Sequence, residues 1–487
     1  MSNYFLNEDT PPEDEKPKKK TLNEITKELL DQLRDNPNDL FMSVPMETEE
    51  EPIIQESNDE HVLDHIKAFN IKPKEVKEYL DRFVINQLDA KKALAIAICD
   101  HYNFIKEAFN TNNPSHYTKQ NIIMIGPTGV GKTYLIKRIA ELIGVPFIKS
   151  DATKFTETGY QGGDVEDLVR QLYKKADNNV ELTEHGIIYL DEIDKITGSQ
   201  SSQHKDVSGR GVQSNLLKIL EDTEVSIRPP WDIQAQIKQM MGSKKSTNNE
   251  KETINTKNIL FIMSGAFNNL SDIVKERLDG STIGFERTTK NKSANDHVEY
   301  LKKLRTQDLV EFGLEPEFAG RLPVRVTLNN LSTDDLYDIL VQMEDSILEQ
   351  YIMSFKRFNI ELNFTDNALK EVSKKAHEEN IGARALSSTL EKVFREFKFE
   401  LPSTKVFYIL ATNSLIKDPI ETLKKYLKNP NKQIKNDIQK TIEYEIEKSK
   451  KPVKDTAKIL EECLLPENKG NILLTIKKQL NQHVTSN

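Results

Sequence analysis

The chain has 487 residues, of which 37% are hydrophobic and 30% are charged, and its formal net charge is −9. This length predicts two to four domains, and the apolar content is sufficient for a sizeable core. Residues 1–60 carry a net charge of −11, so residues 61–487 carry +2. A nearly neutral body disfavours a dedicated nucleic-acid-binding protein, which normally presents a basic face.

The cysteines and the distribution of apolar residues exclude further classes. Cys99 and Cys463 lack the paired spacing of a zinc site and cannot form a disulfide framework, which suits a reducing compartment. No apolar run reaches the roughly 18–20 residues of a membrane span. The N-terminus is too acidic and polar for a secretory signal. We therefore expect a cytoplasmic protein with no membrane contact and no zinc.

Residues 1–60 combine charge, proline and few large apolar side chains, which is typical of a disordered tail. One stretch in it, TLNEITKELLDQL, favours a short amphipathic helix, because Thr21 and Glu24 have capping-box spacing. Leu22, Ile25, Leu29 and Leu33 would share one face of that helix. It would serve as a docking helix, or it is only a marginal helix in a tail.

The region from about residue 70 to 325 alternates between strand-like and helical patterns. NIIMIG (121–126), GIIYLDEID (186–194) and NILFIMSG (258–265) are continuous apolar runs, which are typical of strands buried on both faces of a parallel sheet. Helical patterns such as KTYLIKRIAELIG and DVEDLVRQLYKKA lie between them. The pattern predicts an α/β fold with a parallel, doubly wound sheet.

Later segments are mainly helical. IELNF (360–364) and VFYIL (406–410) predict two further strands, and residues 420–487 contain 14 Lys against 9 Asp and Glu. That Lys/Glu-rich stretch would be a cap, a partner-binding helical pair or a weakly ordered tail. Segments 198–210, 228–256 and 279–300 look like excursions from the core, and loops of this length are usually functional or disordered.

GPTGVGKT matches the pattern of a phosphate-binding loop (P-loop), because it follows a predicted strand and opens a predicted helix. Its glycines let backbone N–H groups surround phosphates, and the helix N-terminus adds positive charge. Lys132 would contact the β- and γ-phosphates, and the Thr133 hydroxyl would bind Mg²⁺. The predicted nucleotide-binding residues here are Gly126, Pro127, Thr128, Gly129, Val130, Gly131, Lys132, Thr133 and Tyr134.

IIYLDEID places two acids at the carboxyl end of a strand, where such sheets bind ligands. Asp191 would hold Mg²⁺ through water, and Glu192 would orient and deprotonate the attacking water. Adjacent acids would do both because successive strand residues point in different directions. The two motifs together predict an ATPase that uses ATP and Mg²⁺.

Seven ordered motifs over roughly residues 70–419 resemble the AAA+ protein unfoldases of the Clp type, and ClpX most closely. They are GPTGVGKT, DATKFTETGYQG, GIIYLDEIDKI, DVSGRGVQ, ILFIMSGAF, PEFAGRLPV and IGARAL. The resemblance implies a P-loop AAA+ domain followed by a smaller, mainly helical α+β domain. We therefore expect a disordered tail over 1–60, a large ATPase domain over 61–325, a small domain over 326–419 and a helical extension over 420–487.

The related unfoldase HslU is an alternative, since GPTGVGKT, ATKFTE and NIGAR are closer to it in wording. HslU carries a long inserted domain between its aromatic pore motif and its DEID strand. Here that gap, from Gly162 to Gly186, is only about 25 residues. PEFAGRLPV and STIGFERT also follow ClpX, so the ClpX-like interpretation is preferred.

The resemblance implies further roles in ATP hydrolysis. Arg321 would be the arginine finger that reaches the γ-phosphate bound by the neighbouring subunit, and Arg384 would be the second sensor. Val84 and Ile85 would contact the adenine, although the family's VIGQ reads VINQ here, which puts that turn in doubt. Ser264 lies near the expected first sensor. A finger acting in trans requires a ring, and the resemblance implies a homo-hexamer.

Loops that would face the substrate also resemble the family. Tyr160 in GYQG would grip unfolded or tagged proteins in the pore, with Gln161 in place of the usual Val. DVSGRGVQ aligns with the second pore loop, where Lys205 and Arg210 are candidate lining charges. An RKH motif is absent from residues 228–256, so substrate preference at the entrance should differ from that of well-known members.

Ile283, Gly284 and Phe285 occupy the position of the tripeptide that docks ClpX onto the ClpP peptidase. The exposed apolar pair within a polar stretch supports partner binding. The four-cysteine zinc domain that usually begins ClpX is not expected. The leading hypothesis is an ATP-dependent unfoldase that feeds a ClpP-like peptidase. A peptidase-independent remodelling chaperone and a nucleic-acid-associated AAA+ motor are alternatives, and the pore and docking motifs argue against the latter.

Overall fold

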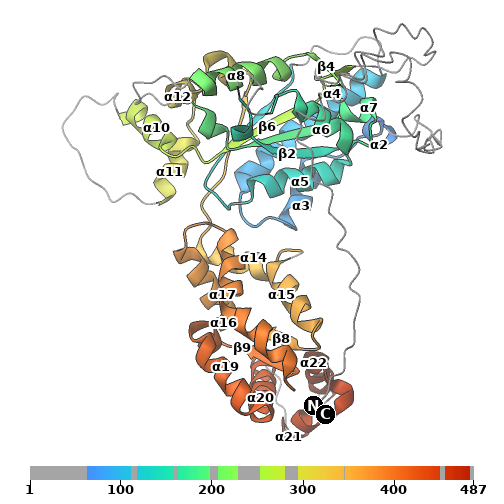
Figure 1. Ribbon diagram of the computed structural model, residues 1–487, viewed down its shortest axis with the longest axis vertical. Helices are drawn as coiled ribbons and strands as arrows, with labels where there is room; N and C mark the ends of the chain where they lie inside the picture. The colour runs from blue at the N-terminus through green and yellow to red at the C-terminus, as the bar shows by residue number, and fades with distance from the viewer. Residues whose placement is uncertain are drawn as a thin grey trace, which may run out of the picture. The chain divides into compact units, whose positions relative to one another are not determined.

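A computed structural model describes residues 63–110, 118–156, 163–197, 207–228, 253–279, 294–344, 346–449 and 456–482 (Figure 1). The chain from Glu60 onward forms one compact unit. Among the described helices, none is both long and apolar enough to cross a membrane.

Five parallel strands form the main sheet, in the order β2-β3-β6-β1-β7. Their bounds are β1 Ile122–Ile125, β2 Phe147–Asp151, β3 Ile187–Asp191, β6 Leu260–Gly265 and β7 Val324–Thr327. Strand β6 pairs with β1 on one side and β3 on the other. Because all strands are parallel, the loops that follow β1, β3 and β6 leave the sheet at the same edge.

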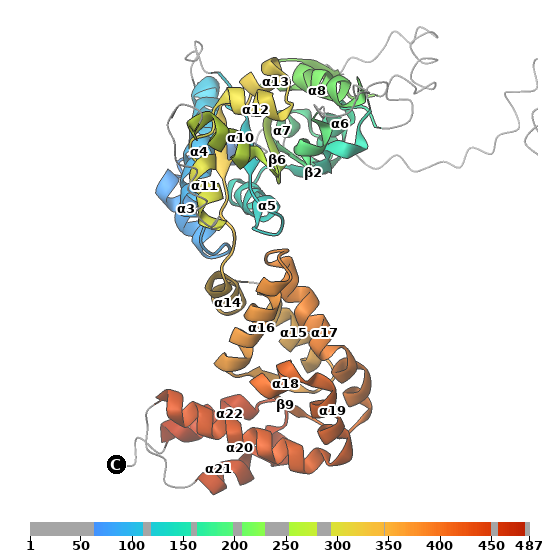
Figure 2. The ribbon, with the colours of Figure 1, turned by 90° about the vertical axis from the view of Figure 1, so that its left-hand side faces the viewer.

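Alternate residues of the central strands pack into two cores, one on each face of the sheet. Ile122 and Met124 belong to the core that contains helices α3 (Pro73–Asp81), α4 (Leu88–Asn110) and α5 (Lys132–Ile143). Ile123 and Ile125 belong to the core that contains α6 (Asp167–Lys175) and α8 (Val207–Leu220). Figures 1 and 2 show α5 and α8 on opposite sides of the sheet. This double burial explains the continuous apolar strand sequences.

The remaining elements of this region surround the sheet. They are α2 Asp64–Lys67, η3 Ala152–Lys154, α7 Val180–Thr183, η4 Ile193–Ile196, β4 Glu224–Ser226, β5 Thr253–Asn255, α10 Leu270–Asp279, α11 Ala294–Leu301, α12 Thr306–Phe312 and α13 Pro316–Gly320. Strands β4 and β5 form an antiparallel pair, and α8 and α11 begin inside predicted excursions. The predicted bounds of the excursions 198–210 and 279–300 therefore include residues that are helical in the structure.

The chain after β7 is mainly helical, as the sequence predicts. Its elements are α14 Thr333–Val341, α15 Ile347–Lys356, β8 Glu361–Phe364, α16 Asp366–Glu378, α17 Arg384–Glu400, η5 Leu401–Ser403, β9 Tyr408–Ala411 and α18 Asn413–Lys417. Strands β8 and β9 are parallel neighbours, which confirms the two predicted strands. Ser332 begins α14 with a capping box, because its side chain accepts a hydrogen bond from Asp335 N.

The described residues of the C-terminal extension form four helices and a short 3-10 turn: α19 Pro419–Lys428, α20 Pro430–Ser449, α21 Thr456–Cys463, η6 Pro466–Asn468 and α22 Ile472–Gln482. Their buried side chains, including Tyr426 and Ile438, belong to the same core as β8 and β9. Glu361 accepts hydrogen bonds from the backbone N–H groups of Ile472 (2.6 Å) and Leu473 (2.9 Å) at the start of α22. The described extension is therefore a packed part of the fold, and the weakly ordered tail is ruled out for it.

Candidate functional site

The P-loop connects β1 to α5, and the side chain of its lysine folds back to contact the backbone of the loop. Gly129 and Gly131 have φ values of +77° and +98°, which favour glycine. The Lys132 Nζ donates hydrogen bonds to the carbonyl oxygens of Gly126 (2.6 Å) and Pro127 (2.8 Å). Burial lowers the pKa of Lys132 below its ordinary value. The ammonium group is thus held at the loop that is predicted to bind phosphate.

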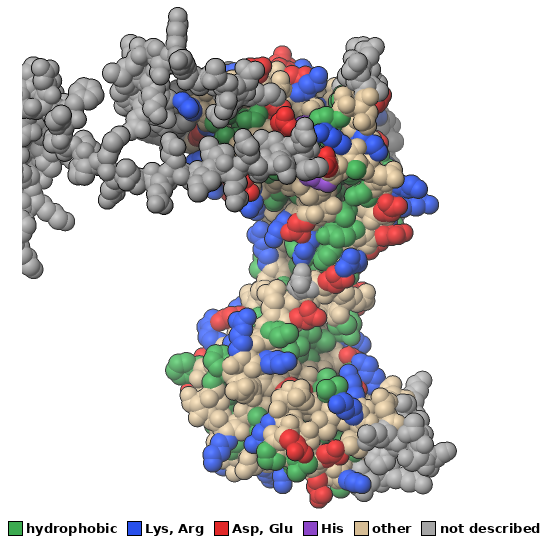
Figure 3. All heavy atoms as spheres, turned by 90° about the vertical axis from the view of Figure 1, so that its right-hand side faces the viewer, with side chains coloured by type: hydrophobic (Ala, Val, Ile, Leu, Met, Phe, Trp, Pro, Cys, Tyr) green, Lys and Arg blue, Asp and Glu red, His purple; other side chains and the backbone are tan. Residues whose placement is uncertain are grey.

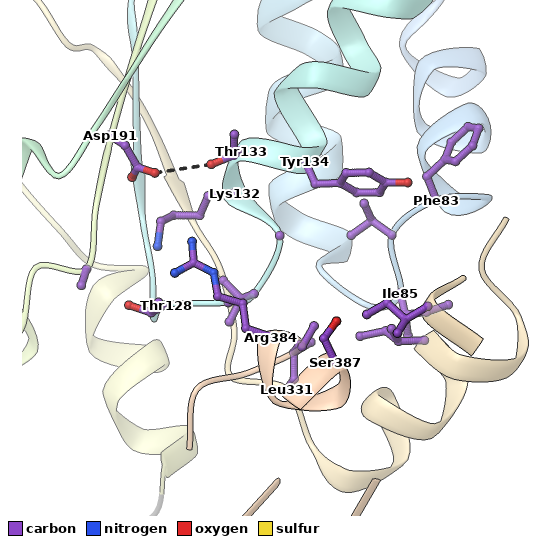
Figure 4. Close-up of a pocket in the computed structure, with 18 of the residues that line it drawn as sticks. Phe83, Ile85, Thr128, Lys132, Thr133, Tyr134, Asp191, Leu331, Arg384 and Ser387 are labelled. Carbon is purple, nitrogen blue, oxygen red and sulfur yellow. Dashed lines mark hydrogen bonds between the residues drawn. The ribbon is translucent and has the colours of Figure 1, made fainter. Parts of the chain in front are cut away.

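Asp191 ends β3 and lies opposite the start of α5. Its carboxylate accepts a hydrogen bond from Ser264 Oγ (2.6 Å), forms a salt bridge with Lys149 Nζ (3.1 Å), and lies 3.4 Å from Thr133 Oγ1 (Figure 4). Burial alone would raise the pKa of Asp191, but the Ser264 hydrogen bond and the Lys149 cation outweigh it and lower the pKa. This carboxylate is therefore held ionised beside the Thr133 hydroxyl.

Glu192 follows β3 in a left-handed conformation, with φ 59° and ψ 32°. This conformation is uncommon for residues other than glycine, and such outliers gather at functional sites. Asp191 and Glu192 both line the pocket. The expectation that strand alternation separates their roles is wrong, because β3 ends at Asp191 and the turn at Glu192 sets its direction instead.

The turn before α17 closes the pocket from the C-terminal part of the chain. Ala383 N donates a 2.9 Å hydrogen bond to Gly129 O. A Cβ on Gly382 would lie 2.7 Å from that same oxygen, so only glycine allows this approach. Arg384 begins α17, lines the pocket, and extends toward Lys132 (Figure 4). Two cationic side chains from distant parts of the sequence therefore face one pocket.

An apolar compartment adjoins the phosphate-binding end. Val84 and Ile85 line it together with Leu331, Ile339 and Ile347. Val84 is 5% exposed. The whole pocket has a volume of about 580 Å³, which is within the usual range for small-molecule sites. An apolar wall next to a cationic end suits a base joined to phosphates.

The turn that follows Ile85 carries Asn86 where the family sequence has glycine. Asn86 has a φ of 59°, and Asn tolerates the left-handed region better than most residues. Its side chain accepts from Gln87 N (2.7 Å) and donates to Asp335 Oδ1 (3.1 Å). The buried Gln87 amide pairs with both backbone groups of Asn329, at 2.9 and 2.7 Å. Asn86 therefore supplies both the backbone angle and two hydrogen bonds.

The structure brings most predicted ATPase residues together and leaves others apart. Val84, Ile85, Thr128–Tyr134, Asp191, Glu192 and Arg384 line one pocket, whereas Gly126 and Pro127 contact Lys132. Arg321 does not line the pocket and forms a salt bridge with Glu221. Arg210 lies on α8 and pairs with Glu315. Tyr160, Gln161, Lys205 and Ile283, Gly284 and Phe285 lie outside the described residues.

Lys149 is a pocket residue that no sequence motif indicated. It lies on β2, next to β3 in the sheet, and its register partner is Tyr189. The Tyr189 hydroxyl in turn contacts Ser264 Oγ at 2.6 Å and Thr133 Oγ1 at 3.2 Å. A single lysine in FIKSD is an ordinary strand residue until the strand order is known. Its role at Asp191 therefore had no local signal.

The P-loop, the parallel sheet and the acid-ended strand define an AAA-type P-loop ATPase. Residues 117–325 match the family described as AAA domain (Cdc48 subfamily), and residues 331–396 match the C-terminal, D2-small domain, of ClpB protein. The chain is 41% identical over 355 residues to the ATP-dependent Clp protease ATP-binding subunits ClpX of Borrelia duttonii and of Borrelia recurrentis. Each alignment covers 72% of this chain and 80% of the relative.

The ClpX of Treponema denticola is also 41% identical, over 335 residues that cover 68% of this chain and 78% of the relative. The chain belongs to the ClpX family of AAA+ proteins. This membership agrees with the preference for ClpX over HslU.

Proposed function

We propose that this protein is an ATP-driven unfoldase and translocase that forms a ring and delivers protein substrates to a ClpP-like peptidase. One observation carries the proposal: a single pocket is lined both by the P-loop and β3 acids and by Arg384 of α17. A nucleotide in this pocket would contact the sheet and the C-terminal helices at once. Hydrolysis can then alter how these two parts meet, which is the motion that a translocase needs.

The oxygen ligands in the pocket fit Mg²⁺ with a nucleotide. Thr133 and Asp191 offer a hydroxyl and an ionised carboxylate 3.4 Å apart, and Mg²⁺ prefers such ligands. When bound, Mg²⁺ would neutralise charge on the β- and γ-phosphates. Lys132 would leave its loop carbonyls for phosphate oxygens. Glu192 would take the proton from the attacking water, and Ser264 would hold Asp191 in place.

The two arginines would act from different subunits. Arg384 faces the pocket of its own chain, so it would sense phosphate there. Arg321 is about half exposed and lies outside that pocket, which suits a finger for a neighbouring subunit. A closed head-to-tail ring would supply every pocket with one finger. The hexamer follows from the family resemblance alone, and the cytoplasmic location and the lack of zinc likewise stay predictions.

A nucleic-acid motor is the weaker alternative. On the face shown in Figure 3, lysine and arginine side chains are interspersed with acidic ones over the described residues. A dedicated nucleic-acid surface would gather cations in a stripe or patch. ATPase activity that rises with protein substrate, and stays unchanged with DNA, would agree with the proposal.

The decisive experiment measures degradation of a tagged, stably folded protein by the purified chain together with a ClpP-like peptidase and ATP. We expect degradation with the wild type and loss of it with Tyr160→Ala, which should retain ATPase activity. Phe285→Ala should retain unfolding but lose peptidase binding in a pull-down. Unfolding without any peptidase binding by the wild type would instead favour the remodelling chaperone.

A further inference from the structure

Gln213 is a buried residue of α8 that joins the end of β3 to the helix preceding Arg321. Its Nε2 donates to the carbonyl oxygen of Ile196 (3.0 Å), and its Oε1 accepts from Glu315 N (2.8 Å). Ile196 ends η4, which begins directly after Glu192. Glu315 is the N-cap of α13, which ends directly before Arg321. One amide therefore connects the turn after the catalytic acids to the finger helix.

The contact between α8 and η4 is also close along the backbone. A Cβ on Gly209, in the first turn of α8, would lie 2.7 Å from the Ile196 carbonyl oxygen. Glycine is thus required for this approach. Gln213 and Gly209 both lie against the Ile196 carbonyl oxygen. We therefore expect that a shift of η4 would move α8 with it.

The residue directly after the other end of α8 contacts Arg321 itself. Glu221 Oε1 accepts a 2.6 Å hydrogen bond from Arg321 Nη2. Both backbones are anchored: Thr256 Oγ1 donates to Glu221 O (2.6 Å), and Asn121 Nδ2 donates to Arg321 O (3.3 Å). Thr256 and Asn121 are buried. The carboxylate therefore orients a guanidinium group that is about half exposed to solvent.

A buried amide is costly unless its donors and acceptors are satisfied. An apolar side chain of similar size would avoid burying an amide, but it would remove this partner from the Ile196 carbonyl oxygen and from Glu315 N. The three partners of Gln213, which include Gly313 O at 3.4 Å, all belong to η4 or to the segment leading to Arg321. These bonds account for an amide in a position that is 0% exposed.

We propose that α8 couples the hydrolysis site of one subunit to the arginine finger that this subunit offers to its neighbour. Gln213 and Glu221 are the positioning residues: Gln213 fixes the finger helix to the end of β3, and Glu221 sets the direction of Arg321. The inference rests on the proposed action of Arg321 in trans. A misplacement of about 1 Å is enough to lower a rate roughly a hundredfold, so loss of either contact should reduce ATP hydrolysis.

Mixed rings test this assignment. Glu192→Gln subunits offer a normal finger without hydrolysing ATP, and Arg321→Ala subunits retain a normal site without offering a finger. Mixing these two should recover ATPase activity that neither has alone. No recovery would show that Arg321 does not act in trans, and would overturn both the finger and the coupling.

Gln213→Met removes the amide at nearly constant volume. Alone, it should lower ATPase activity at least tenfold. Mixed with Glu192→Gln subunits, its activity should rise severalfold, because its intact sites then receive normal fingers. Mixed with Arg321→Ala subunits, activity should not rise. The reverse pattern would place the defect in its own site, and no rise with either partner would mean that its own site is impaired as well as its finger; either result would overturn the proposal.

Glu221 provides a surface variant that does not endanger folding. Glu221→Ala should lower ATPase activity by about two- to fivefold, the range that corresponds to loss of one exposed ion pair. Glu221→Gln should restore most of it, because its carbonyl oxygen still accepts from Nη2. Glu221→Ala carries the same mixing test if Gln213→Met does not assemble. Wild-type activity of Glu221→Ala, or a Glu221→Gln variant as impaired as it, would contradict the positioning role.

Discussion

At the residue scale, the pocket places two adjacent acids in one site by different means. Asp191 is held by Ser264 and Lys149, whereas Glu192 has a left-handed backbone and is exposed. The first acid is held ionised, and the second remains accessible to water. These surroundings support the proposed division between metal binding at Asp191 and proton transfer at Glu192.

Glu192→Gln should therefore abolish turnover while preserving nucleotide binding. The amide cannot accept the proton from water, and general-base catalysis typically contributes about 10²–10⁴-fold in rate. The contacts of Asp191 with Ser264 and Lys149 do not involve the Glu192 side chain. Steady-state ATPase assays and equilibrium binding of a fluorescent ATP analogue would measure the two effects. Hydrolysis at the wild-type rate would refute the general-base role.

The Asn86 turn gives a second prediction at this scale. Asn86→Ala places an ordinary side chain at φ 59° and removes both side-chain hydrogen bonds, so it should weaken ATP binding and stability by about 1–2 kcal/mol. Asn86→Gly is the matched control, because it removes the bonds but relieves the backbone strain. Thermal unfolding and ATP titration would compare the pair. Equal behaviour of Ala and Gly would show that the backbone angle is unimportant.

At the scale of elements, the extension is joined to the β8–β9 pair by polar groups as well as by its core. Asp437 on α20 is 2% exposed and accepts hydrogen bonds from the Tyr426 hydroxyl of α19 and from Leu410 N of β9 (3.5 Å). Thr441 on the same helix contacts the Tyr408 hydroxyl of β9 at 2.7 Å. These contacts fix how α20 lies against β9.

Glu361 should determine whether α22 stays attached. Glu361→Ala removes two charge-assisted hydrogen bonds to the helix N-terminus, which we expect to cost about 1–2 kcal/mol. Hydrogen exchange should then speed up in α22 and remain unchanged in the distant helix α5. Glu361→Gln, which keeps an acceptor, should lie between wild type and Ala. Unchanged protection of α22 in Glu361→Ala would contradict this anchoring role.

The sequence predicted elements with a strong local pattern and missed those defined by distant partners. The buried runs of β1, β3 and β6 and the P-loop are visible in short windows. The β4–β5 pair was not predicted, because each strand is only three residues long and lies at the edge of a polar segment. The salt bridge of Lys149 can be predicted only when the order of the strands in the sheet is known. The hydrogen bonds of Gln213 join residues up to 102 positions apart in the sequence. No local pattern reveals such pairs.

At the scale of the whole molecule, two buried titratable groups respond to pH in opposite directions. Burial raises the pKa of Asp437 to about 6 from 3.8 and lowers the pKa of His101 to about 3 from 6.5. The folded chain thus keeps the Asp437 proton longer than the unfolded chain, so this term loses stability as pH rises from about 4 to 6. The folded chain resists protonation of His101, so that term loses stability as pH falls below about 6.5.

Single variants would separate the two terms. Asp437→Asn should gain stability relative to wild type as pH rises from 4.5 to 7.5, because only the wild type must ionise a buried carboxyl group. His101→Gln should gain relative to wild type as pH falls over the same interval. Thermal midpoints of the three proteins at both pH values would measure this. A pH-independent difference for either variant would mean that its group does not titrate as described.

The meeting of Gly129 with the turn at Gly382 consists of main-chain atoms on both sides. Backbone atoms are common to all residues, so this junction does not depend on which side chains either part carries elsewhere. A hybrid of this N-terminal region with the C-terminal region of a relative should therefore still close its nucleotide pocket, provided that both glycines are present. We therefore expect side-chain changes elsewhere in either region to leave this main-chain junction intact.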